Sequence, residues 1–167
     1  MNLLIIRHAV AEDREDFAGT GQPDDQRPLT DDGIKKMKKA ANGLQRAVDA
    51  IDHLATSPLT RAAQTAQIIS EAYDIGGAEV VPALVPGARP EDFVEWCAPH
   101  GDKDVVAIVG HEPHLSSLAG WLTGEDAGSE IELKKGGACL IEFDRAPGRG
   151  EGTLRWLLTP RLLRRLD

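Results

Sequence analysis

Two histidines and two arginines occupy positions from which they could act together. Arg7 and His8 directly follow one aliphatic run, and His111 follows another after a single glycine. Arg61 lies near the start of a helical stretch. A guanidinium is a permanently charged, planar donor that matches phosphate oxygens, and a neutral imidazole is a nucleophile that can accept a phosphoryl group without a metal. These four residues therefore predict phosphoryl transfer through a phosphohistidine.

The surroundings of such a nucleophile matter as much as the nucleophile itself. A phosphoryl group in transfer carries charge on its equatorial oxygens, which two arginines and a second histidine would stabilise. The chain has no glycine-rich loop of the Walker type. Taken alone, a histidine or arginine at the end of a strand is more often a solvated residue or an ion-pair partner. The coincidence of several at one place favours a site.

The elements that would position these residues follow from hydrophobic periodicity. Short aliphatic runs predict strands, and apolar residues at helical spacing predict helices. Residues 11–28 form a polar stretch rich in Asp, Glu, Gly and Pro and predict a long surface loop. Residues 161–165 read as a short basic tail. The predicted strands are 3–6, 53–56, 80–81, 104–109, 138–143 and 153–158, and the predicted helices are 31–47, 59–73, 91–97 and 114–122.

Strands that alternate with helices predict an α/β fold, a three-layer sandwich with a largely parallel sheet and right-handed crossovers. The length of 167 residues favours one domain over residues 1–167. In open sheets of this kind, ligands bind outside the carboxyl ends of the strands. Arg7, His8 and His111 come directly after predicted strands, and Arg61 follows another at a helix N-terminus, which favours an anion. All four are therefore expected at one edge of the sheet.

Composition excludes several classes of function. The formal net charge of −8 disfavours nucleic acid and anionic membranes as partners. The two cysteines, Cys97 and Cys139, have no disulfide or zinc spacing, which favours a reducing, cytoplasmic location. The apolar run 3–6 is too short for a signal peptide or a membrane span. No exposed apolar stripe is evident, so a monomer is expected.

Several segments together carry a resemblance to a known family. The chain resembles the histidine phosphatase superfamily, and within it the small SixA-type phosphohistidine phosphatases, over nearly its whole length. The segments are Leu-Leu-Ile-Ile-Arg7-His8-Ala9, Arg27-Pro28-Leu29-Thr30-x-x-Gly33, Thr56-Ser57-Pro58-Leu59-x-Arg61-Ala62-x-Gln64-Thr65-Ala66, Val109-Gly110-His111-Glu112-Pro113 and a late Leu-Lys-Lys-Gly-Gly-Ala-Cys-Leu-Ile-Glu-Phe. In combination these motifs are highly specific.

The resemblance implies a phosphoglycerate-mutase-like α/β sandwich and assigns a role to each of the four residues. His8 is implied as the nucleophile that becomes phosphorylated, and Arg7, Arg61 and His111 as the rest of the phosphate pocket. The implied activity is that of a phosphatase that uses neither a metal nor a cofactor. Its implied substrate is a phosphohistidine on another protein, such as a phosphotransfer domain.

Two positions depart from the family pattern, and the proton donor is open. Ala9 stands where many relatives have glycine, and Glu112 stands where an asparagine is common. Glu112 could repel the substrate, act as an acid or point outward. Cleavage of a phosphate ester needs a proton donor, for which Glu91, Asp92 and Glu95 lie in the corresponding segment. A solvated face on a short helix is the better explanation for all three. A leaving imidazole needs little or no acid.

Three functions are therefore weighed. The first is a phosphatase for phosphohistidine on proteins, which the absence of an obvious acid and the short loops favour, because short loops leave a site open. The second keeps the mechanism and acts on a small phosphomonoester or phosphoanhydride. The third is a phosphate-binding module without turnover.

The remaining charged and histidine patterns have plainer explanations. Pro113 interrupts the His111-to-His114 segment, which lacks the helical pair of zinc hydrolases, so no metal is expected there. His53 and His100 have no partner pattern and are expected to be exposed. The lysines at 35–39 are expected to form a solvated face.

Overall fold

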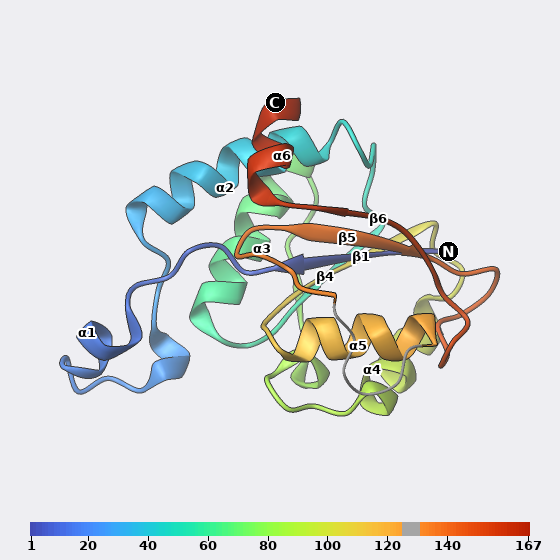
Figure 1. Cartoon of the computed structure of the whole chain (residues 1–167), viewed down its shortest axis with the longest axis horizontal. Helices are drawn as coiled ribbons and strands as arrows, with labels where there is room; N and C mark the ends of the chain where they lie inside the picture. Colours follow the sequence, from blue (N-terminus) through green and yellow to red (C-terminus); the bar gives the residue numbers. More distant parts are fainter. Residues whose placement is uncertain (125–130) are drawn as a thin grey trace.

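The computed structural model describes residues 1–124 and 131–167 and contains one mixed six-stranded sheet with helices on both faces (Figure 1). The strands are β1 (Asn2–Arg7), β2 (His53–Thr56), β3 (Glu79–Val80), β4 (Val105–Gly110), β5 (Ala138–Glu142) and β6 (Thr153–Leu158). The helices are α1 (Arg14–Ala18), α2 (Asp31–Leu44), α3 (Thr60–Tyr73), α4 (Pro90–Cys97), α5 (His114–Thr123) and α6 (Pro160–Leu166), with three short 3₁₀ turns, η1 (Asp24–Gln26), η2 (Pro82–Leu84) and η3 (Ala98–His100).

The strand order in the sheet is β3-β2-β4-β1-β5-β6. The pairs β2–β3, β2–β4 and β1–β4 are parallel, whereas β5 runs antiparallel to both of its neighbours. Strand β5 is therefore the one reversed strand, and the prediction of a largely parallel sheet is confirmed. The crossovers place the carboxyl ends of β1, β2 and β4 side by side, where the predicted site residues begin.

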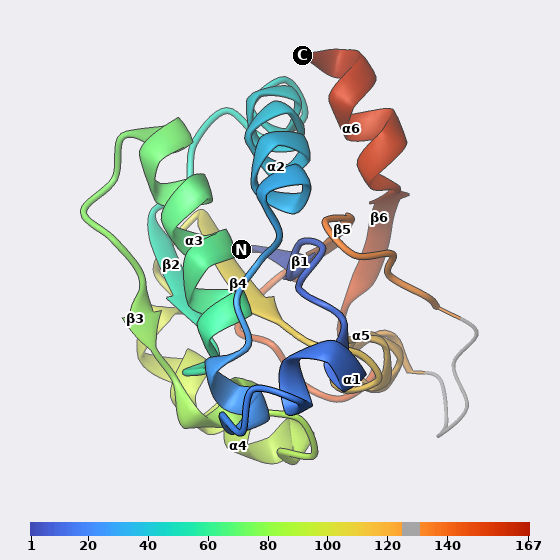
Figure 2. The same cartoon turned by 90° about the vertical axis from the view of Figure 1, so that its left-hand side faces the viewer.

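The central strand β1 shows why the fold has three layers. Its residues Leu3 to Ile6 are all fully buried, and successive side chains point to opposite faces. Leu4 and Ile6 belong to the core that α2, α3 and α6 cover, and Leu3 and Ile5 belong to the core that α4 and α5 cover. Figures 1 and 2 show these two helical layers on either side of the sheet. A strand buried on both faces has to be aliphatic throughout, as this one is.

Two segments contain structure that the sequence did not predict. The stretch 11–28, expected to be a loop, contains the short helices α1 and η1. The Asp13 side chain accepts hydrogen bonds from the backbone N–H groups of Glu15 and Asp16 and so caps α1. The supposed basic tail forms α6, which starts with Pro160 and buries Leu163 against α2. Helix α1 has five residues and α6 has seven, so each is too short to give a clear periodic signal.

The packing of α6 on α2 requires glycine at position 43. A Cβ atom built on Gly43 would lie 1.9 Å from the backbone oxygen of Leu163, so the two helices touch through their backbones there. Replacing a helical glycine by alanine ordinarily stabilises a helix by about 1 kcal/mol. We expect Gly43→Ala instead to lower the free energy of unfolding by about 1–3 kcal/mol, because α6 must move away. Urea denaturation measures this change.

Gly76→Ala is the matched control for that prediction. In the part of the chain that the structure describes, a Cβ atom at Gly76 would have no neighbour within 4 Å, and the Gly76 backbone lies outside the positive-φ region. This variant is expected to be neutral or to stabilise the chain by about 0.4–1 kcal/mol. Equal effects of the two substitutions would contradict the backbone contact between α2 and α6.

Candidate active site

The four predicted site residues meet at the edge of the sheet where β1, β2 and β4 end. Figure 2 faces this edge, with α1 in front of it. Arg7 is the last residue of β1, and His8 and His111 follow β1 and β4, while Arg61 is the second residue of α3. All four line one cavity of about 630 Å³. The other residues that line it are Ala11, Glu12, Asp13, Arg14, Arg27, Pro86, Glu112, Pro113 and Lys135.

The imidazole of His8 is held in one tautomer. Its Nδ1 lies 2.7 Å from the carbonyl oxygen of Ala9, and a carbonyl can only accept, so Nδ1 carries the proton. In a neutral ring this leaves the lone pair on Nε2 free for attack. The N–H of Ala9 donates in turn to the Thr65 hydroxyl at 3.0 Å, and Thr65 donates to the carbonyl oxygen of Arg61 at 2.7 Å. The hydroxyl thus connects the His8 segment to the helix that carries Arg61.

The start of α2 positions the chain that follows His8. Thr30 caps α2 by accepting from Gly33 N–H, and its own N–H donates to the carbonyl oxygen of Val10 at 3.1 Å. A Cβ atom on Gly33 would lie 2.1 Å from that same oxygen. The Thr30-x-x-Gly33 motif therefore lets the helix approach the backbone directly after His8.

His111 faces His8 across the cavity. The two ring centroids are 5.1 Å apart, and Nε2 of His111 lies 2.8 Å from the hydroxyl oxygen of Ser57. Within the described residues, the buried Nδ1 of His111 has no hydrogen-bond partner. Ser57 directly follows β2, so side chains after three neighbouring strands converge on the same space.

The arginines are anchored through their terminal nitrogens. Arg7 donates from Nη1 to the carbonyl oxygen of Leu133 at 2.7 Å. Arg61, with only 4% of its surface exposed, donates from Nη1 to the backbone oxygen of Asp24 at 2.9 Å, and its Nη2 lies 3.3 Å from the Asp24 carboxylate. In the described part of the chain, the buried Nε–H of each guanidinium has no partner. Buried donors of this kind are what an anion-binding site contains.

Both histidines are uncharged at neutral pH. Burial lowers the pKa of His8 to about 4, with a further contribution from the positive charges of Arg61 and Arg7 and partial opposition from the Ala9 carbonyl. Burial also lowers the pKa of His111 to about 3, and the neighbouring His8 and Arg61 add to that effect. A neutral His8 is the form that has a nucleophilic lone pair.

Comparison with known proteins identifies the family to which a chain with this site belongs. The family model for the histidine phosphatase superfamily (branch 1) matches residues 3–85. An uncharacterised protein of Picosynechococcus sp. (strain ATCC 27264 / PCC 7002 / PR-6) is 34% identical to the chain over 142 residues, which is 82% of each of the two proteins. The chain belongs to the histidine phosphatase superfamily. Members of this superfamily are phosphatases, and the present chain resembles the SixA type within it.

Further relatives agree with that assignment. Phosphohistidine phosphatase SixA of Escherichia coli (strain K12) is 26% identical over 166 residues, which cover 96% of this chain and 94% of SixA. Among solved structures, protein histidine phosphatase SixA complexed with tungstate superposes with a TM-score of 0.82 at 24% identity, covering 96% of this chain and 98% of that one. Alpha-ribazole phosphatase from Shigella flexneri superposes with a TM-score of 0.75 at 20% identity, covering 96% and 97%. The phosphoglycerate-mutase-like fold is confirmed.

Two of the proton donors suggested for this histidine phosphatase are not at the cavity. Glu91 and Asp92, together with Glu95, lie on α4, and none of the three lines the cavity. Helix α4 buries Phe93 against the sheet, so its acidic face turns away, and the Asp92 carboxylate pairs with Arg89 at 2.6 Å. The structure therefore agrees with the solvated helix face and contradicts the proton-donor alternative for both residues, because the face that a short helix presents depends on what it packs against.

Glu112 does line the cavity, and its carboxylate is already engaged. One oxygen accepts a hydrogen bond from the Ser116 hydroxyl at 2.5 Å, and the other accepts from the backbone N–H of Leu133 at 3.2 Å. Of the alternatives considered for Glu112, an outward orientation is excluded. The carboxylate instead connects the loop after β4 to the segment that also holds Arg7.

The acid that holds two of the cavity arginines was not among the site residues predicted from sequence. The carboxylate of Asp24 accepts from Nε of Arg27 at 2.8 Å and pairs with Arg61, so one acid holds two arginines. Burial opposes the effect, but hydrogen bonding to Arg27 and the charge of Arg61 keep the pKa of Asp24 below its usual value. Asp24 and Arg27 lie in the polar stretch 11–28, whose lack of periodicity gives no sign of which side chains turn inward. The one signal in the sequence that could have pointed to this part of the site was the family motif that begins at Arg27.

The lowered histidine pKa values predict how stability depends on pH. Unfolded histidines bind protons near pH 6.5, whereas folded His8 and His111 do so only near 4 and 3. As the pH falls from about 6.5 to about 4, the unfolded state binds more protons, so the free energy of unfolding decreases by up to about 1.4 kcal/mol per pH unit for each histidine. Urea denaturation at pH 7, 6 and 5 measures the slope. The variant His8→Gln/His111→Gln should show a shallower slope, and an unchanged slope would refute the assignment.

Among the described residues, no helix is long and apolar enough to span a bilayer.

Proposed function

We propose that this chain is a phosphohistidine phosphatase that acts on a phosphorylated histidine of another protein. The observation that carries the proposal is the state of His8, which is neutral, with its proton on Nδ1 and its Nε2 free beside Arg7, Arg61 and His111. A nucleophilic nitrogen among two guanidiniums suits attack on phosphorus.

In the first step, Nε2 of His8 forms a bond to phosphorus while the bond from phosphorus to the substrate nitrogen breaks. When the other nitrogen of the substrate ring carries a proton, the electron pair leaves with a neutral imidazole, so no further acid is needed. Nδ1–H of His8 keeps its hydrogen bond to Ala9, which stabilises the positive charge that the phosphorylated ring acquires. Arg7 and Arg61 are the groups that would stabilise charge on the phosphoryl oxygens.

In the second step, a water oxygen attacks phosphorus and the electron pair of the bond to Nε2 returns to His8. The product leaves as dihydrogen phosphate, and His8 is again neutral. Asp13 also lines the cavity, but its carboxylate accepts hydrogen bonds from Asp16 and Glu15, which hold its pKa below the usual value. Asp13 is therefore ionised and is no proton donor at neutral pH.

The proposed substrate class is supported by charge, by exposure and by similarity. The cavity lining contains four arginines and Lys135 against three carboxylates, so a local excess of positive charge exists on a chain with net charge −8. Glu12, Arg14 and Pro86 at the cavity are exposed, so a side chain on a protein surface can approach. The similarity to SixA of Escherichia coli covers nearly the whole chain. A phosphotransfer domain is the partner that we propose.

Competition between two substrates tests this function. A phosphohistidine-bearing protein domain and an aryl phosphate are supplied to the chelator-treated protein, and the release of inorganic phosphate is measured. We expect faster turnover of the phosphohistidine. Preference for the aryl phosphate would instead support a small-molecule phosphomonoesterase. If no phosphoenzyme formed with either substrate, the result would contradict the phosphatase proposal and support a phosphate-binding module without turnover.

A further inference from the structure

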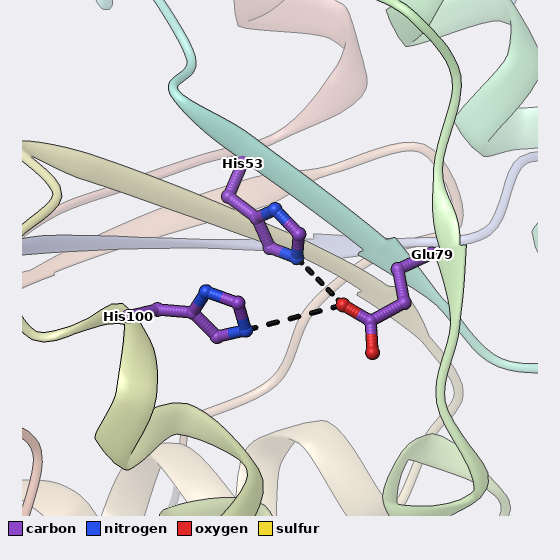
Figure 3. A group of neighbouring side chains, drawn as sticks. All are labelled: His53, Glu79 and His100. Atoms are coloured by element: carbon purple, nitrogen blue, oxygen red, sulfur yellow. Dashed lines mark hydrogen bonds and ion pairs between the residues drawn. The ribbon is translucent and has the colours of Figure 1, made fainter.

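Three potential metal ligands meet on a different part of the sheet from the active site. His53 is the first residue of β2, Glu79 is the first residue of β3, and His100 is the last residue of η3. Figure 3 shows both imidazoles directed at the Glu79 carboxylate. The active site begins after the other end of β2, where Ser57 contacts His111. His53 and His100 have no partner pattern in the sequence and were expected to be exposed. The structure contradicts this expectation, because both are half-buried and paired with Glu79.

The ligand atoms are close enough to share one ion. Oε2 of Glu79 lies 2.8 Å from Nε2 of His53 and 3.9 Å from Nε2 of His100, and the three ligand atoms all lie within 4.8 Å of one another. Two ligands that each lie 2.0–2.1 Å from a tetrahedral zinc ion are about 3.3 Å apart. The observed separations bracket that value. The two imidazoles are stacked, with centroids 4.1 Å apart and planes at 18°, and the Nε2 atom of each is directed at Oε2 of Glu79 (Figure 3).

A fourth residue holds the carboxylate in place. The indole N–H of Trp96 donates to Oε1 of Glu79 at 3.0 Å, which leaves Oε2 for the two histidines. This hydrogen bond, together with His53 and His100, lowers the pKa of Glu79, so the carboxylate is charged. The Trp96 ring also packs against both imidazoles, with centroids 5.9 and 5.1 Å away. Residues that orient ligands in this way are typical of metal sites.

We propose that His53, Glu79 and His100 bind a divalent transition-metal ion, with zinc the best match. Two imidazole nitrogens and one carboxylate oxygen form a donor set that zinc accepts, with a fourth position left for water. The ion would link β2, η3 and β3. Strand β3 has two residues and lies at the edge of the sheet, where a link to its neighbours adds most to local stability. The inference is independent of the proposed phosphatase activity.

Metal titration of the full chain tests the proposal. After chelator treatment, Zn²⁺ binding is measured by calorimetry, and Co²⁺ binding is followed by its visible absorption. We expect one equivalent to bind, with an increase in the melting temperature because the ion binds the folded state. The active site also contains two imidazoles, so the variant His8→Ala/His111→Ala is the control and should bind one equivalent with unchanged affinity.

Ligand variants separate a metal site from a hydrogen-bonded network. Glu79→Gln keeps the shape of the side chain, and His100→Ala removes one nitrogen. Each should weaken Zn²⁺ binding by more than Trp96→Phe, for which a loss of about 10- to 100-fold is expected because Trp96 acts through the carboxylate. Circular dichroism of the metal-free variants shows whether each is folded.

Two results would overturn the proposal: no saturable binding to the wild-type chain, or binding that persists unchanged in both Glu79→Gln and His100→Ala. Phosphohistidine hydrolysis in the presence of chelator should be the same for wild type and His100→Ala. A failure of the phosphatase assay would leave the metal titration unaffected, so the two proposals fail separately.

Discussion

His8→Ala is expected to lower the turnover of phosphohistidine by about 10⁴- to 10⁶-fold, the range observed when a covalent nucleophile is removed. The physical reason is that Nε2 of His8 is the atom that accepts the phosphoryl group, and the remaining pocket can only bind and polarise the substrate. The measurement is phosphate release under single-turnover conditions, together with trapping of the acid-labile phosphoenzyme. Wild type should accumulate label on the protein, and the variant should not.

His8→Asn and His100→Ala are the controls for that loss. Asparagine retains a donor near the Ala9 carbonyl and offers no nucleophilic nitrogen, so it should be as inactive as alanine while it preserves the local hydrogen bond better. His100→Ala removes a histidine far from the cavity and should keep full activity in chelator. Substantial hydrolysis by His8→Ala, with a label still found on the protein, would show that the nucleophile is another residue.

Arg61→Ala is expected to reduce the rate of phosphoryl transfer by about 10²- to 10³-fold, the usual cost of removing one donor that stabilises transition-state charge. Arg61 is almost fully buried and held by Asp24, so its charge acts in a site with little solvent screening. Arg61→Lys retains the charge but loses the planar fork, so an intermediate loss is expected. Tungstate, a tetrahedral oxyanion, should bind each variant more weakly than wild type, as calorimetry can measure.

Arg14→Ala is the matched control for Arg61. Arg14 lines the same cavity and lies 3.6 Å from the same Asp24 carboxylate, but 74% of its side chain is exposed. Solvent screens such a charge, so the pair is worth about 0–1 kcal/mol and the rate should change only a few-fold. If Arg14→Ala and Arg61→Ala reduced the rate equally, the position of the charge within the cavity would have no special effect, and the role assigned to Arg61 would be wrong.

The core of the fold and four site residues were accessible from sequence for definite reasons. An aliphatic run such as 3–6 can only be a strand that is buried on both faces, and the alternation of such runs with helices leaves few topologies. The carboxyl ends of parallel strands are where ligands bind, so Arg7, His8 and His111 could be placed together without coordinates. The family motifs added their expected roles.

The contents of the polar segments depended on tertiary structure. Asp24 and the short helix α1 lie in a stretch without periodicity, and only the approach of that stretch to Arg61 shows that it completes the cavity. The face that α4 turns to the site also depended on tertiary structure. Because Phe93 is buried, Glu91 and Asp92 of the same helix lie away from the cavity.

The sequence by itself determined which residue types stand after which strands, because hydrophobic periodicity and motif spacing are local properties. Only the tertiary structure decided which distant side chains meet. It set the tautomer of His8 through a backbone carbonyl and the low histidine pKa values through burial. It also brought His53 and Glu79 together through the pairing of β2 with β3, and placed His100 of η3 beside them. Hydrogen bonding, desolvation and metal coordination all depend on distances of a few ångströms between residues that are far apart in the chain, and those distances exist only after folding.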